Sequence, residues 1–126
     1  MEDVDQLVEG HLAAWMIADT PERGAALGRV YTEDVTVVEP DRVLRGREAL
    51  NERITELHRL FGGLEFTVLG SIQRNQDYAL YQWSQPVPGR TEPITGWDVL
   101  TFEGELITHV VMFIPGFDDL EIPEPA

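Results

Sequence analysis

The sequence predicts an α+β fold in which three helices pack against a curved antiparallel sheet. Two observations predict this class. Over the first 61 residues, apolar side chains recur at intervals of three and four, the spacing of one helix face. From residue 64 onward they alternate with polar side chains, as in strands that bury one face. The length suits one domain, so residues 1–126 are expected to form a single unit with 115–126 as a surface tail.

The first half is expected to hold three helices and one short strand. Thr20–Pro21 supplies a cap and a first-turn proline for the second helix, Gly46 precedes the third, and Gly62 ends it. The expected helices are residues 4–18, 20–30 and 47–61, and the expected strand is residues 35–39. Helices arranged in this way can cover one face of a sheet.

The second half has the pattern of four antiparallel strands. The first strand begins near Leu64, and the others are expected at residues 78–85, 94–102 and 106–114. Glu103–Gly104 is a tight hairpin signal between the last two strands. A curved sheet of this kind can enclose a pocket between its concave face and the helices.

The chain is strongly acidic, with a formal net charge of −14 from 23 acidic residues against nine basic residues, all arginine. Nucleic acids and anionic lipids bind clustered cations, so neither is an expected partner. No run approaches the roughly 18 apolar residues of a membrane span, and no signal peptide is expected. The lack of cysteine excludes disulfides, cysteine zinc sites and thiol catalysis, and it fits a cytoplasmic location.

Neither a metal nor a cofactor is expected. The three histidines do not have the spacing of metal ligands, and the sequence has no glycine-rich phosphate loop and no serine nucleophile elbow. Any chemistry would therefore be carried out by side chains such as carboxylates.

Glu39 is the first candidate catalytic residue. In the stretch VTVVEP it shares strand parity with Val35 and Val37, and Pro40 follows it directly. One interpretation is a solvated acid at a strand end. The other is a base that faces a cavity together with the two valines, because alternation cannot bury both valines and turn Glu39 outward without a bulge.

Asp98 is the second candidate. It lies in the middle of an expected strand, a position that disfavours aspartate. Both faces of this strand are apolar, so parity alone does not orient it. Either Asp98 pairs with a neighbouring arginine, or it is an inward-facing acid able to donate a proton or a hydrogen bond.

The order of elements, with the motifs YTEDVTVVEP, LRGREAL and GWDVLTFEGELITHVVMF, resembles the nuclear transport factor 2-like (NTF2-like) superfamily over roughly residues 5–114. Within it, the sequence looks most similar to the ketosteroid isomerase and SnoaL-like polyketide cyclase branches. The resemblance implies a cone-shaped, cystatin-like roll. It implies no single activity, because the fold hosts isomerases, cyclases, dehydratases, epoxide hydrolases and binding proteins.

The resemblance also implies a site. Ketosteroid isomerase combines a carboxylate base with an oxyanion hole made of a tyrosine and a protonated aspartate. By resemblance, Glu39 takes the position of the base and Asp98 that of the aspartate. Trp15 stands sixteen residues before Tyr31, where the family has its tyrosine, so that hydroxyl is missing. Tyr31 and Tyr81 are candidate substitutes.

Aromatic and apolar side chains are expected to wall the cavity, although in this fold core and cavity wall merge. The expected substrate-binding residues are Trp15, Tyr31, Phe66, Tyr81, Trp83, His109, Val111 and Phe113. The last three belong to this set because the family's final strand lines the cavity at their parity. A lone histidine such as His109 is otherwise a hydrogen-bonded structural residue.

The same parity predicts an apolar outer face on the sheet. Its expected members are Leu80, Trp97, Val99, Val110, Met112 and Ile114. Because monomers rarely expose large apolar patches, a homodimer through the sheets is expected. The competing explanation is that the parity is reversed.

The sequence therefore favours a cofactor-independent acid–base enzyme that acts on a hydrophobic carbonyl compound, steroid-like or polyketide-like. Glu39 would shuttle a proton, and Asp98 would stabilise the developing enolate or the leaving group. Isomerisation, aldol cyclisation and dehydration all pass through such a state. The alternative is a non-catalytic small-molecule-binding protein, which the missing tyrosine favours. An epoxide hydrolase is a poorer fit, because no arginine lies within GWDVLTF.

Overall fold

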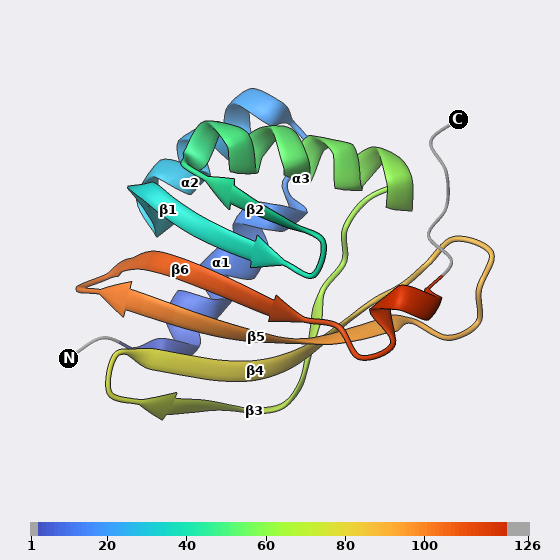
Figure 1. The fold of residues 1–126 in the computed structure, drawn as a ribbon. Helices are drawn as coiled ribbons and strands as arrows, with labels where there is room; N and C mark the ends of the chain where they lie inside the picture. The colour runs from blue at the N-terminus through green and yellow to red at the C-terminus, as the bar shows by residue number, and fades with distance from the viewer. Residues whose placement is uncertain (1–2, 121–126) are drawn as a thin grey trace.

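The computed structural model describes residues 3–120, which form helices packed against one six-stranded sheet (Figure 1). The helices are α1 (Val4–Met16), α2 (Thr20–Val30) and α3 (Arg47–Phe61), with a short 3₁₀ helix at Phe117–Asp119. The strands are β1 (Tyr31–Glu39), β2 (Arg42–Arg45), β3 (Thr67–Asn75), β4 (Tyr78–Gln85), β5 (Ile94–Glu103) and β6 (Leu106–Phe113). The α+β fold is confirmed.

Local signals place the helix ends. The Asp3 carboxylate accepts hydrogen bonds from the first turn of α1, and Asp19 does the same for α2, in which Pro21 occupies the first turn. Gly62 ends α3 in the left-handed conformation at φ 66°, a region that favours glycine. The three helices therefore begin and end within two residues of the predicted positions.

The sheet is mixed rather than antiparallel throughout. Its strand order is β2-β1-β6-β5-β4-β3, and β1 pairs with β6 in parallel while every other pair is antiparallel. The expected antiparallel pairing holds for every pair but one: the chain passes from β1 through β2, α3, β3, β4 and β5 and brings β6 back beside β1 in the same direction. The short edge strand β2 was not predicted, since Arg42–Arg45 is exposed and lacks an alternating apolar pattern.

The core lies between the helices and one face of the sheet. Val35 and Val37 of β1 are fully buried, and they meet Val8 and Leu27 of the helices in one continuous cluster. No helix among residues 3–120 is both long and apolar enough to cross a membrane.

A bulge in β6 changes which of its side chains face this core. Phe102 of β5 pairs with Ile107, whereas the adjacent Thr101 pairs with His109, so Thr108 is an extra residue in β6. One inserted residue turns all following side chains to the opposite face.

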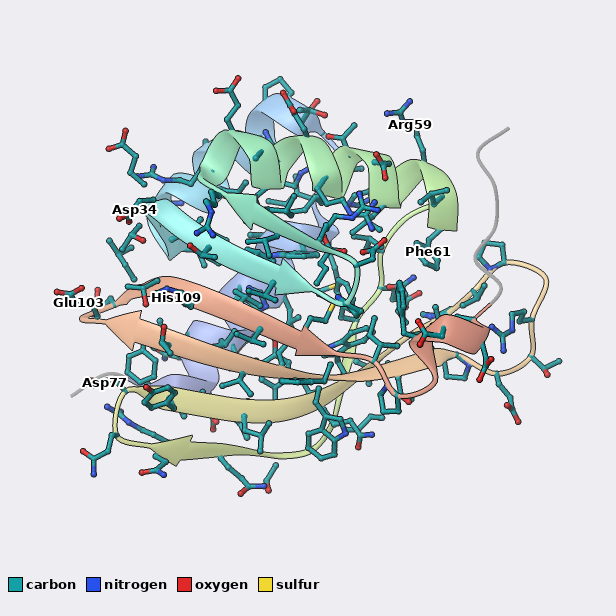
Figure 2. All side chains as sticks on the ribbon, in the orientation of Figure 1. Asp34, Arg59, Phe61, Asp77, Glu103 and His109 are labelled. Carbon is teal, nitrogen blue, oxygen red and sulfur yellow. The ribbon has the colours of Figure 1, made fainter. Side chains whose placement is uncertain are left out.

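The expected orientation of His109, Val111 and Phe113 is therefore wrong. His109 lies at the surface (Figure 2). Phe113 is 57% exposed, and Val111 is half-buried. Val110 is instead fully buried, and Met112 faces the same side as Val110. The opposite expectation, that Val110, Met112 and Ile114 face outward, is wrong for the same reason.

Candidate functional site

An apolar cavity of about 80 Å³ lies where the C-terminal end of α3 meets the inner face of the sheet. Its wall combines α1, α3, four strands and the segment that follows β6. The lining residues are Trp15, Glu39, Arg53, Leu57, Leu60, Phe61, Leu64, Phe66, Trp83, Gln85, Ile94, Met112, Ile114, Phe117 and Leu120. Only two of these side chains are charged, Glu39 and Arg53.

Glu39 faces the cavity in the way that strand alternation predicts. It is buried together with Val35 and Val37, and it contributes to the cavity wall at the end of β1. The interpretation of Glu39 as a solvated acid is wrong. A buried carboxylate is costly unless a partner compensates its charge.

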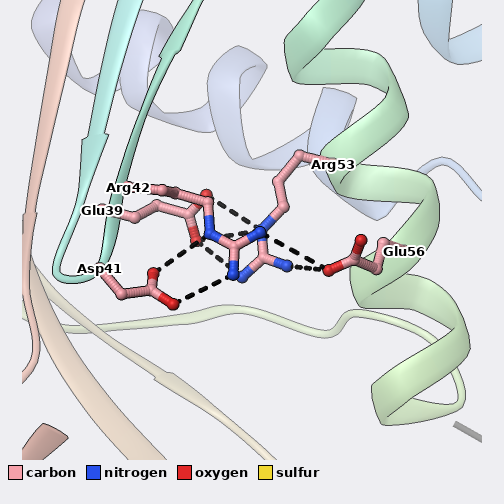
Figure 3. A network of polar contacts seen from close by, with 5 residues as sticks. All are labelled: Glu39, Asp41, Arg42, Arg53 and Glu56. Carbon is pink, nitrogen blue, oxygen red and sulfur yellow. Dashed lines mark hydrogen bonds and ion pairs between the residues drawn. The ribbon is translucent and has the colours of Figure 1, made fainter.

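Arg53 of α3 is that partner (Figure 3). Its Nε–H donates to both Glu39 oxygens at 3.1 and 3.3 Å, and Nη2 donates to Glu39 Oε1 at 3.1 Å. The side chains are only 5% and 10% exposed for Glu39 and Arg53 respectively. This two-pronged geometry fixes the carboxylate at one end of the cavity.

Three exposed residues extend the ion pair toward solvent. Arg53 Nη1 donates to Glu56, which also lies 3.7 Å from Arg42 Nη1, and Arg42 donates to Asp41 at 3.0 and 3.2 Å. The hydrogen bonds from Arg42 lower the pKa of the Asp41 carboxyl. The outer part of the network is solvated, so the buried Glu39–Arg53 pair is its structurally important part.

Sequence reasoning missed Arg53, although a signal was present. Arg53, Leu57 and Phe61 recur every four residues on α3, so they share one helical stripe. Phe61 points from α3 toward the sheet and lines the cavity, whereas Arg59 points away (Figure 2). A charged residue within an otherwise apolar, inward-facing stripe indicates a buried partner.

Gln85, the remaining polar residue of the wall, is held by the backbone. Its Oε1 accepts from the Glu65 N–H at 2.7 Å, and its Nε2 donates to the Pro86 carbonyl at 2.9 Å. These bonds occupy the amide, so the reactive groups in the cavity wall are Glu39 and Arg53.

Asp98 is buried but does not line the cavity. The Tyr81 hydroxyl donates to Oδ2 at 2.5 Å, Trp83 Nε1–H donates to Oδ1 at 2.9 Å, and His11 Nε2 lies 3.5 Å from Oδ2. Its strand neighbour Met112 lines the cavity instead. The expectation of a buried acid is confirmed, but Asp98 accepts hydrogen bonds from three groups of the core and does not share the cavity with Glu39.

The network continues from His11 to α1 and β1. His11 Nδ1 hydrogen-bonds the Tyr31 hydroxyl, which also accepts from Trp15 Nε1–H at 2.8 Å. One assignment satisfies all of these contacts: the Tyr31 O–H donates to Nδ1, and Nε2–H donates to Asp98. Both indole N–H groups therefore point into the network, while the rings of Trp15 and Trp83 face the cavity.

Burial raises the pKa of both tyrosines in this network. Desolvation raises the pKa of Tyr31 well above its ordinary value, and it does the same for Tyr81, with the nearby Asp98 adding to both shifts. Both phenols therefore stay protonated, as hydrogen-bonding groups of the core and not as proton donors to a ligand.

Of the predicted wall, Trp15, Phe66 and Trp83 line the cavity. Tyr31 and Tyr81 lie behind it, and the three predicted residues of β6 face outward or are half-buried. In the segment expected to form a surface tail, Phe117 and Leu120 line the cavity, while residues 121–126 lie outside the described residues. Within residues 3–120, no three His, Asp or Glu side chains are placed to hold a metal ion.

The profile of the SnoaL-like domain matches residues 8–110. The chain belongs to the SnoaL-like family. That match covers most of the chain, including the cavity residues Trp15, Glu39, Arg53 and Trp83. Among curated proteins, none matches this SnoaL-like domain significantly.

Solved structures show the same fold. A protein of Agrobacterium tumefaciens, provisionally named an isomerase of the SnoaL-like family, is 24% identical over 88% of this chain and 96% of its own, with a TM-score of 0.79. A provisionally named SnoaL-like polyketide cyclase from Jannaschia is 14% identical over 91% and 89% of the two chains, with a TM-score of 0.70. A protein of Catenulispora acidiphila with a ketosteroid isomerase-like fold, in complex with trimethylamine, is 18% identical over 85% of this chain and 83% of its own, with a TM-score of 0.69.

Proposed function

We propose that this SnoaL-like protein is a cofactor-independent acid–base enzyme that moves a proton on a hydrophobic carbonyl compound, with Glu39 as the base. Isomerisation, aldol cyclisation and dehydration each begin with such a transfer. The provisional names of two structural neighbours, an isomerase and a polyketide cyclase, fall in the same class.

One observation carries the proposal. Glu39 is a buried carboxylate in the wall of an otherwise apolar cavity, held in place by Arg53. Burial of the Glu39 carboxylate brings little net stability, because its attraction to Arg53 at best offsets the cost of removing both charges from water. A fixed carboxylate in apolar surroundings is suited to removing a proton from carbon.

The reaction needs no further reagent. A Glu39 oxygen takes the proton from the carbon next to the carbonyl group, and the C–H electron pair forms a C=C bond. The carbonyl π electrons move onto the oxygen, which gives an enolate. In a β,γ-unsaturated ketone, return of the proton from Glu39 to the γ-carbon moves the C=C bond into conjugation with the carbonyl group. Attack of the enolate on a second carbonyl group instead gives an alkoxide, which takes the proton back from Glu39 to form the aldol product.

Asp98 serves this site indirectly. By accepting from Tyr81 and Trp83, it positions the indole ring that forms part of the cavity wall. Asp98 is not among the residues that line the cavity, so in this proposal it positions Trp83 and does not contact the enolate.

Exchange of the α-protons of cyclohexanone for deuterium, followed by ¹H NMR in D₂O, tests the base directly. Glu39→Gln should reduce the catalysed exchange by about 10²–10⁴-fold, the typical contribution of a general base. Glu56→Gln is the matched control, because Glu56 contacts the same arginine but is about half exposed. Full exchange by Glu39→Gln would contradict the proposal.

A non-catalytic binding protein is the second candidate. It is favoured by the position of Trp15, whose N–H donates to Tyr31 and leaves no hydroxyl in the cavity. The trimethylamine complex of the Catenulispora protein shows that one neighbour with this fold holds a small molecule. Saturable ligand binding without any exchange activity in the unmodified protein would favour this candidate.

We also propose a homodimer through the outer face of the sheet. With the corrected parity, this face carries Leu80, Trp97, Val99, Val111 and Phe113, which lie on adjacent strands. A stable dimer through this face should bury on the order of 1,200–2,000 Å² in total.

A further inference from the structure

Arg53 keeps unused hydrogen-bond donors beside the cavity. A guanidinium group carries five N–H bonds. Nε–H and one N–H of Nη2 bind Glu39, and one N–H of Nη1 binds Glu56. Nη1 and Nη2 therefore each retain one N–H for which residues 3–120 provide no acceptor. Because Arg53 lines the cavity and is 10% exposed, a ligand oxygen would find donors there.

The charges of the wall favour an uncharged ligand. Glu39 and Arg53 compensate each other, and no other lining residue is charged. A ligand with a net charge would remain uncompensated among apolar side chains, which is costly. A neutral molecule with one acceptor oxygen satisfies Arg53 without this cost.

The volume of the cavity limits the size of the ligand. Pockets for drug-sized molecules measure about 300–1,000 Å³, and an engineered cavity of about 150 Å³ binds benzene. At about 80 Å³, the cavity has about half the volume of that benzene site, so a single ring fills it and extends through its open side, whereas a four-ring compound exceeds it several-fold.

We infer that the cavity takes an uncharged carbonyl compound of no more than about one ring, whose carbonyl oxygen accepts hydrogen bonds from Nη1 and Nη2 of Arg53. The inference rests on the proposed function and makes Arg53 its second catalytic residue. As Glu39 removes the α-proton, negative charge develops on the carbonyl oxygen, and Arg53 stabilises it. Removing one such donor typically reduces the rate by about 10²–10³-fold.

Binding of 4-fluorophenol, a one-ring analogue of an enol, tests Arg53 without any turnover. Its ¹⁹F NMR signal can be titrated against Glu39→Gln and against the double variant Glu39→Gln/Arg53→Gln. Glutamine at position 39 mimics the protonated base and leaves no buried carboxylate unpaired when Arg53 is removed, so both proteins should fold. We expect binding to weaken at least 10-fold in the double variant.

The control is Glu39→Gln/Arg59→Gln, which removes an exposed arginine from the same helix and should leave binding unchanged. Equal affinities of Glu39→Gln and Glu39→Gln/Arg53→Gln would overturn the role of Arg53. The deuterium-exchange assay tests the role of Glu39 separately. If Glu39→Gln retains full exchange while binding still depends on Arg53, the assignment of Glu39 as the base is wrong and the role of Arg53 in binding stands.

Displacement of 4-fluorophenol by ketones of increasing size tests the limit on the ligand. Cyclohexanone should displace the probe from the unmodified protein, a two-ring decalone should do so at least 10-fold less well, and a steroid ketone should not do so at all. Displacement by the steroid at lower concentration than by cyclohexanone would overturn the size limit.

Discussion

Removal of one partner from the buried Glu39–Arg53 pair should lower the free energy of unfolding by several kcal/mol. Arg53→Met leaves Glu39, whose side chain is 5% exposed, without its cation. Loss of one partner from a buried pair costs about 3–5 kcal/mol, whereas replacing both by apolar residues is often neutral. We therefore expect Arg53→Met to lower the free energy of unfolding by about 3–5 kcal/mol, a large part of the roughly 5–15 kcal/mol of a typical domain.

Urea unfolding followed by circular dichroism measures this cost. The double variant Glu39→Leu/Arg53→Met should recover to within about 1 kcal/mol of the unmodified protein, because no buried charge remains. Arg42→Met is the control: its contacts with Asp41 and Glu56 are about 40–50% exposed, so it should cost less than about 1 kcal/mol. If Arg53→Met costs no more than Arg42→Met, the Glu39–Arg53 pair is not the buried, compensated pair described above.

Three further predictions concern the wall, the buried phenols and the outer face. A Cβ at Gly96 would lie 2.4 Å from the Trp83 ring, so Gly96→Ala should destabilise the protein by about 1–3 kcal/mol in urea unfolding. The raised pKa values of Tyr31 and Tyr81 mean that the unfolded chain releases their protons near pH 10 and the folded chain does not. Stability should therefore be insensitive to these groups below about pH 10 and fall above it, as measured by unfolding at pH values between about 8 and 11.5. Phe113→Asp should convert the proposed dimer to a monomer in light scattering, because it places a charge in the apolar face.

Each of these predictions has its own control. A Cβ at Gly10, in α1, would have no atom within 4 Å, so Gly10→Ala should stabilise the protein by about 0.5–1 kcal/mol. Equal effects of Gly10→Ala and Gly96→Ala would contradict the packing argument. Constant stability up to about pH 11.5 would show that the buried phenols ionise in the folded chain. Arg59→Asp, on a helix and away from the sheet, should leave the dimer intact, and a monomeric unmodified protein would rule out the proposed interface.

Within residues 3–120, the sequence by itself indicated the three α-helices, five of the six strands and the inward position of Glu39. Helix ends follow from local chemistry: carboxylates at Asp3 and Asp19 bind first-turn N–H groups, and Gly62 adopts a conformation that other residues avoid. The burial of Glu39 follows from alternation along β1, since the valines beside it must face the core. These signals act within a few residues, so they can be read without knowing the rest of the fold.

The tertiary structure decided the partners of each acid and the wall around them. The Thr108 bulge depends on the pairing of β5 with β6, so no pattern within β6 alone predicts that Met112 and not Phe113 faces inward. Arg53 meets Glu39 only because α3 crosses the end of β1, and Asp98 is surrounded by donors from α1 and β4. Contacts between residues far apart in the chain arise from the packing of whole elements, and that packing, not the local pattern, separates the acid of the cavity from the acid of the core.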